Sequence, residues 1–226
     1  KFSPARLIQA EPGEKLPHFH AVPLQRLYQR ARDDGAEIIV TLDTDAFPVH
    51  EGWLDEFVAH IQSGAVLAGV WRDELEHTVA PYVHPSCLCT TVTFIEDSGL
   101  RLDTHNIHGE QKVDTLAALT YTAQKKGKRI HALERSNRNQ LHYIMSGIYG
   151  DRVYHHGAGS RKRFTFWGEP KTEQQLDANV RMRTILDELV FRFNQDFVQW
   201  LRGIETSKRR RTFQRALNLA KEQLSE

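Results

Sequence analysis

The segment AEIIVTLDTDAFPVHEGWL, residues 36–54, decides how the chain is expected to fold. Apolar side chains run from Ile38 to Leu42 and end at Asp43-Thr44-Asp45, so that two carboxylates lie one residue apart. A continuous apolar run of this kind is typical of a strand that is covered on both faces. We therefore predict a central strand of a parallel sheet, with paired acids at its carboxyl end.

The segments on either side alternate between strand and helix signals. The predicted strands are residues 5–9, 38–42 and 65–70, and the predicted helices are residues 22–34, which Gly35 ends, and residues 52–64. A helix between two apolar strands is the signature of a βαβ unit. The sequence thus predicts an α/β fold with a mixed, mostly parallel sheet flanked by helices.

Composition limits the class of protein. The chain has 226 residues, is 40% hydrophobic and 26% charged, and carries a formal net charge of +1, which fits one soluble globular domain with an appendage. It holds no apolar run of about 18 residues, so no membrane span is predicted. A cytoplasmic location is expected. Cys87 and Cys89 are too close in sequence to bridge each other, and we predict that both are buried thiols.

The paired acids suit a divalent cation. In open α/β sheets, ligands bind beyond the carboxyl ends of the strands. In an extended backbone Asp43 and Asp45 would point the same way, with Thr44 on the opposite side. Two carboxylates are ligands that Mg²⁺ or Mn²⁺ accepts together with substrate phosphates and water. The alternative is that Asp45 caps the next turn or helix and Asp43 is only solvated.

Two segments carry a family resemblance. IIVTLDTDAFPVHEGWLDEFVAHI, residues 38–61, resembles the D-x-D segment of nucleotide-sugar-dependent glycosyltransferases of the GT-A fold, in particular the family 2-like group. EQKVDTLAALTYTAQKKGKRIHAL, residues 110–133, resembles that family's pattern of an acid that opens a helix, then a glycine, then a strand. The resemblance covers about residues 5–163. It implies a GT-A-like (Rossmann-like) fold and a metal-dependent, inverting transfer of a sugar from a nucleotide-diphosphate donor to an acceptor hydroxyl.

The same resemblance implies roles for the paired acids and for Asp114. Asp45 would be a direct ligand of Mn²⁺ or Mg²⁺, Asp43 a ribose or indirect metal contact, and Thr44 part of the donor site. The family's usual acid pair is replaced here by Val113-Asp114, which leaves Asp114 as the base that accepts the proton of the acceptor hydroxyl. The cation would stabilise charge on the departing diphosphate.

Asp114 also has a structural interpretation. An aspartate before TLAAL is a good N-cap, and a cap can serve as base at the same time. If Asp114 is only a cap, the base has to be sought among Glu110, Asp103 and His108.

A third segment, YGDRVYHHGAGSRKRF at residues 149–164, combines two imidazoles with a glycine-rich basic turn. The resemblance implies that His156 is the third protein ligand of the cation, with His155 as its substitute. Neighbouring side chains of a strand point to opposite faces, so one histidine serves. The donor diphosphate would be gripped by Ser160, Arg161 and Lys162. The alternative is a polar surface loop.

The acceptor would lie near residues 72–94. YVHPSCL resembles the segment that runs beneath the acceptor site in such transferases, and the candidate contacts are Arg72, Glu74, His84 and Ser86. The spacing of Asp103, His105 and His108 favours a solvated or acceptor-facing loop over a metal site.

The predicted domain organisation follows from the same family resemblance. Residues 1–168 would form the catalytic domain, with an incomplete nucleotide-binding part because only 42 residues precede Asp43. Residues 169–226 are predicted to form a C-terminal helical extension that covers the sheet or joins the subunits of a homo-oligomer. The acceptor class stays open between a glycan, a small molecule and a modified nucleic acid.

Two other functions compete with sugar transfer. SKRRRTFQR, residues 207–215, suggests a nucleic-acid-binding or DNA-modifying protein, although the net charge of +1 favours a solvated helix face. A nucleotidyltransferase also uses paired acids on a related sheet, but it accounts less well for Asp114 and the His-His-Gly segment.

Overall fold

The computed structural model describes residues 21–74, 80–102, 107–108, 111–112, 116–137 and 146–157. The described residues fall into two compact units, one within residues 21–41, 54–69 and 80–132 and the other within residues 42–53, 70–74 and 133–157. The predicted strand at residues 5–9 and the predicted C-terminal helices lie outside the described residues. Among the residues described, none of the helices has the length and apolar character needed to cross a bilayer.

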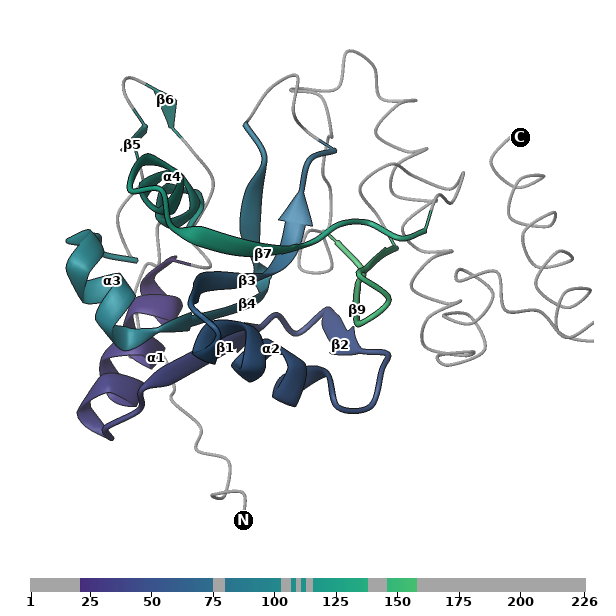
Figure 1. Cartoon of the computed structure of the whole chain (residues 1–226), viewed down its shortest axis with the longest axis horizontal. Helices are drawn as coiled ribbons and strands as arrows, with labels where there is room; N and C mark the ends of the chain where they lie inside the picture. Colours follow the sequence, from purple (N-terminus) through teal and green to yellow (C-terminus); the bar gives the residue numbers. More distant parts are fainter. Residues whose placement is uncertain are drawn as a thin grey trace, which may run out of the picture. The chain divides into compact units, whose positions relative to one another are not determined.

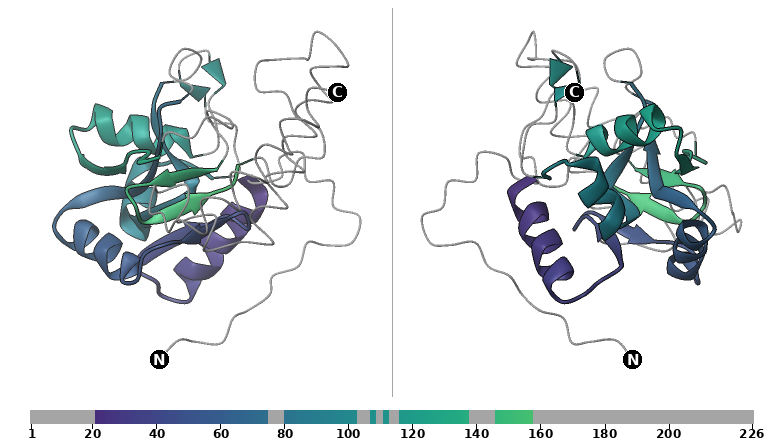
Figure 2. Two further views of the ribbon diagram at one scale, coloured as in Figure 1. Left: turned by 90° about the vertical axis from the view of Figure 1, so that its right-hand side faces the viewer. Right: turned by 60° about the vertical axis from the view of Figure 1, so that its left-hand side comes forward.

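The first unit is built on a four-stranded sheet with four helices around it (Figures 1 and 2). The strand order is β1-β4-β3-β7. The strands are β1 (Ile38–Leu42), β3 (Ala65–Arg72), β4 (Tyr82–Thr91) and β7 (Arg129–Leu133), and the helices are α1 (Ala21–Asp33), α2 (Trp53–Gln62), α3 (Val92–Ser98) and α4 (Ala117–Lys125). Two short strands, β5 (Ile107–His108) and β6 (Gln111–Lys112), pair antiparallel.

Contacts along the strands give their directions. The N–H of Val92 donates to the carbonyl of Glu37 at 3.0 Å, whereas the hydroxyl of Thr41 donates to the carbonyl of Pro85 at 2.6 Å, so β1 and β4 run antiparallel. Arg129 contacts the hydroxyl of Ser63 just before β3. Beyond the other ends of the same two strands, Arg135 contacts Glu74, so β7 runs parallel to β3.

The α/β class with a mixed sheet and flanking helices is confirmed, but among the described strands β1 has neither the parallel neighbour nor the full burial that we predicted. Among the described strands β1 lies at one end of the sheet, its only neighbour there is the antiparallel β4, and Ile38 to Thr41 are half-buried rather than buried. The fully buried strand of this sheet is β4, from Pro85 to Thr90. Cys87 and Cys89 are buried free thiols there, as predicted, and burial raises the pKa of Cys89 to about 11.

The helices begin and end where local chemistry predicts. The predictions for α1 and α2 are confirmed to within two residues, and Gly35 follows α1 with a φ of 80° that favours glycine. Phe57 and Ile61, four residues apart, are the buried side chains of α2. Helix α3, which we did not predict, is capped by Thr91, whose hydroxyl accepts the N–H of Phe94 at 3.0 Å.

Helix α4 begins just after the segment that was predicted to cap it. Its N-cap residue is Leu116, with a φ of 65° and no side-chain cap hydrogen bond. Asp114, the predicted cap, lies outside the described residues. The expected order of helix, Gly127 and strand β7 is confirmed. Helix α4 packs on β4, where Tyr82, Ala117 and Tyr121 form a buried cluster.

The second unit holds a three-stranded antiparallel sheet of order β2-β9-β8. Its strands are β2 (Ala46–Pro48), β8 (Gly147–Tyr149) and β9 (Val153–His155). Gly150 and Asp151 form the turn between β8 and β9 with φ values of 56° and 55°, and the N–H of Arg152 donates to the carbonyl of Tyr149 at 3.0 Å. Tyr149 pairs with Val153, so the loop holds residues 150–152, and it sets the register that pairs Gly147 of β8 with His155 of β9. On its other side β9 pairs His155 with Ala46 of β2.

Candidate functional site

The two acids lie in a turn rather than in an extended strand. The N–H of Ala46 donates to the carbonyl of Asp43 at 3.0 Å, so residues 43–46 form a turn that leads from β1 into β2. Asp43 and Asp45 are half-buried and Thr44 is exposed. The expectation that simple strand alternation aligns the two carboxylates is therefore wrong, and their placement depends on the groups around the turn.

Thr41 holds the end of the strand that leads to this turn. Its hydroxyl donates to the carbonyl of Pro85 at 2.6 Å and accepts the N–H of Leu88 at 3.1 Å. The side chain of Thr41 thus bridges a carbonyl and an N–H of β4. Sequence reasoning gave Thr41 no role, because this contact depends on the pairing of β1 with β4.

His155 lies beside the turn. Its pairing with Ala46 brings the Nε2 atom to 3.6 Å from Oδ1 of Asp45, and the ring is 4% exposed. The N–H of the next residue, His156, donates to the carbonyl of Asp45 at 2.8 Å. Backbone and side chain of β9 therefore both contact the second acid of the D-x-D motif.

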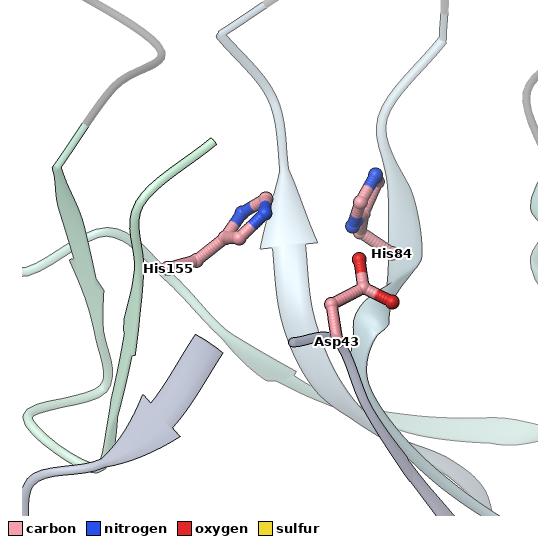
Figure 3. A group of neighbouring side chains, drawn as sticks. All are labelled: Asp43, His84 and His155. Atoms are coloured by element: carbon pink, nitrogen blue, oxygen red, sulfur yellow. The ribbon is translucent and has the colours of Figure 1, made fainter. Parts of the chain in front are cut away.

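Three side chains that the sequence assigned to different roles gather in one group. Asp43, His84 of β4 and His155 each offer one potential ligand atom, and these atoms all lie within 4.8 Å of one another (Figure 3). The structure thus brings Asp43 rather than Asp45, and His155 rather than His156, into the group. The ring of His156 is buried elsewhere, with Nδ1 at 2.8 Å from the hydroxyl of Tyr154.

Two of the proposed acceptor contacts belong to a buried ion cluster. Arg72 and Glu74 have side chains that are only 6% and 9% exposed, and Nε of Arg72 lies 3.0 Å from Oε2 of Glu74. Oε1 of the same carboxylate lies 3.3 Å from Nη1 of Arg135 and accepts the hydroxyl of Tyr149 at 2.5 Å. A buried carboxylate needs such partners, because an uncompensated charge is costly away from water.

The ion cluster continues to His155. Nη1 of Arg72 lies 3.3 Å from Nδ1 of the imidazole. Burial, followed by the positive charge of Arg72, lowers the pKa of His155 to about 3, although Asp45 acts in the opposite direction. The ring is therefore neutral at neutral pH. Burial also raises the pKa of Tyr149, so its hydroxyl keeps its proton and donates to Glu74.

Ser86, the fourth proposed acceptor contact, is fully buried. Its hydroxyl has no hydrogen-bond partner among the described residues, while its backbone N–H donates to Nδ1 of His84 at 3.0 Å. Its visible contribution is thus to orient His84, which is half-buried.

Several predicted site residues lie outside the described part of the chain. These are the base Asp114, the donor contacts Ser160, Arg161 and Lys162, and the loop residues Asp103, His105 and Glu110. His108 belongs to the short strand β5. The basic run at residues 207–215 is also outside it.

No protein family, curated protein or solved structure matches this chain. Its function is therefore argued from the site itself.

The neutral state of His155 predicts a pH dependence of stability. The pKa of histidine is about 6.5 in an unfolded chain, but about 3 here. Between these values the unfolded state binds a proton that the folded state does not, so stability is lost as the pH falls. From pH 7 to pH 5 this histidine alone should lower the free energy of unfolding by about 2 kcal/mol. Urea unfolding of wild type and His155→Gln at both pH values measures this change in the free energy of unfolding. The control is His50→Gln, which replaces an exposed histidine. Equal pH dependence in wild type and His155→Gln would contradict the assignment.

Proposed function

We propose that the chain is a metal-dependent glycosyltransferase that moves a sugar from a nucleotide-diphosphate donor to an acceptor hydroxyl with inversion. The observation that carries the proposal is the turn after β1, where two half-buried carboxylates, Asp43 and Asp45, lie beside the neutral ring of His155. The resemblance of residues 38–61 to the D-x-D segment of GT-A enzymes supports the same assignment.

The two carboxylates fit a hard divalent cation. Mg²⁺ and Mn²⁺ bind through one or two carboxylates and complete their shells with water and substrate phosphate, so Asp43 and Asp45 suffice as protein ligands. When bound, the cation supplies positive charge next to the departing diphosphate. Because both acids are half-buried, their charges are less screened by solvent than those of fully exposed side chains.

The remaining steps belong to the chain's own side chains. Asp114 accepts the proton of the attacking hydroxyl. Ser160, Arg161 and Lys162 donate hydrogen bonds to the diphosphate, with the guanidinium of Arg161 able to bind two oxygens at once. Of the acceptor contacts, Arg72 and Glu74 already use their charges in the buried cluster, which leaves the half-buried His84 as the better one.

The paired acids generate the first functional prediction. Asp43→Ala and Asp45→Ala should each abolish Mn²⁺-dependent binding and hydrolysis of the donor, while thermal unfolding stays cooperative, because neither side chain is part of the apolar core. A panel of nucleotide sugars with Mn²⁺ gives the measurement, and Asp55→Ala, an exposed acid of α2, is the control. The proposal is to be abandoned if no nucleotide sugar is bound or turned over while nucleoside triphosphates are, which is the result expected of a nucleotidyltransferase.

The proposed base, Asp114, generates the second functional prediction. Asp114→Asn keeps the size of the side chain but cannot accept the proton, so turnover should fall by roughly 10²-fold or more while donor affinity stays unchanged. Single-turnover transfer and donor titration separate the two effects. Transfer at a near wild-type rate would remove Asp114 as base and direct the search to Glu110, Asp103 and His108.

A further inference from the structure

One ring nitrogen of His155 already accepts a hydrogen bond. Nη1 of Arg72 lies 3.3 Å from Nδ1 of the ring. A guanidinium carries only donors, so Nδ1 has to be the acceptor and has to hold a lone pair. The proton of the neutral ring is therefore on Nε2, the atom that lies 3.6 Å from Oδ1 of Asp45.

His84 is held in the same way by a different donor. The backbone N–H of Ser86 donates to Nδ1 of His84 at 3.0 Å. A backbone N–H is also only a donor, so Nδ1 of His84 holds the lone pair and the ring proton is on Nε2. Each assignment rests on one local contact, and neither depends on the other.

A metal-bound histidine needs the opposite arrangement. It binds the ion through a nitrogen lone pair and donates its other N–H to a carboxylate, a carbonyl or water. In this protein the lone-pair nitrogen of each ring already accepts an N–H, and the other nitrogen carries a proton. The two imidazoles therefore do not fit a divalent cation, although the carboxylates of Asp43 and Asp45 do.

The donor to His155 is fixed in place. Arg72 is held by Glu74, and Glu74 in turn by Arg135 and the hydroxyl of Tyr149, all within the buried cluster. Turning the His155 ring or moving Arg72 would break a buried ion pair or leave a buried donor without its acceptor, and each costs free energy. Arg72 is thus a positioning residue that sets the tautomer of His155.

We infer that His84 and His155 act as Nε2–H hydrogen-bond donors to oxygen atoms of the site and of its substrate, and that they are not cation ligands. A divalent cation at this turn then contacts Asp43 and Asp45, and water or phosphate oxygens fill its remaining positions. The nature of the substrate oxygens, those of a nucleoside diphosphate, rests on the proposed function. The tautomers and the ligand set do not.

Nitrogen NMR tests the tautomers directly. Long-range ¹H–¹⁵N spectra of the ¹⁵N-labelled 226-residue chain distinguish a protonated ring nitrogen from one with a lone pair, and His84→Gln and His155→Gln assign the signals. Both rings should show a protonated Nε2 and keep it when Mg²⁺ or Zn²⁺ is added. A lone pair on Nε2 of either ring, before or after metal addition, would overturn the inference.

Two sets of variants test whether Arg72 sets the tautomer of His155 and whether the carboxylates rather than the imidazoles bind the cation. Arg72→Met should release the tautomer of His155 and leave that of His84 unchanged. If this variant does not fold, the wild-type spectrum still decides. In titrations with Mn²⁺ alone, Asp43→Asn and Asp45→Asn should each lose more affinity than His84→Gln or His155→Gln, because the aspartate variants remove a ligand whereas the histidine variants remove at most a hydrogen bond to a ligand. A loss in either histidine variant as large as the loss in the aspartate variants would contradict the inference. These titrations contain no nucleotide sugar, so their result does not depend on whether the protein transfers sugars. A failure of the proposed function would be seen in the donor assays instead.

Discussion

The buried carboxylate of Glu74 is the constraint on which the site depends. It follows strand β3 and is paired with two guanidiniums and one tyrosine hydroxyl, from Arg72, Arg135 and Tyr149. Breaking such a pair leaves an uncompensated charge away from water, at a cost of about 3–5 kcal/mol. The segments that carry these side chains are thereby held to one another, and Arg72 transmits the constraint to His155. The hydrogen bonding of His155 beside the turn after β1 therefore depends on this cluster.

In the proposed site the half-buried acids and the two imidazoles would have different tasks. Carboxylates bring negative charge that a hard cation can neutralise, whereas Nε2–H groups bring donors that suit oxygen acceptors. Because Nδ1 of each ring already accepts an N–H, His155 and His84 cannot take the roles of Asp43 and Asp45 without a change in these hydrogen bonds.

The sequence predicted the positions of helices and strands that depend on local signals, but not the features that depend on which strands pair. Periodicity and stop signals located α1, α2 and β3, and the order of helix, glycine and strand located α4 and β7. An apolar run cannot say whether its strand is central or at an edge, and β1 proved to be the end strand of the described sheet. The choice between His155 and His156 required the pairing of β9 with β2, which places His155 opposite Ala46. The Gly150-Asp151 dipeptide is a hairpin signal for β8 and β9, but it gives no information about β2, which lies far away in the sequence.

We propose that a divalent cation at the turn after β1 is held by carboxylates and not by imidazoles. Anomalous diffraction from crystals grown with Mn²⁺ and a nucleoside diphosphate locates the ion directly. We expect a peak within coordinating distance of Asp43 and Asp45 and of phosphate oxygens, with Nε2 of His84 and His155 outside that distance. A peak bound to Nε2 of either histidine, or the absence of a peak at this turn while the nucleotide is bound, would contradict it.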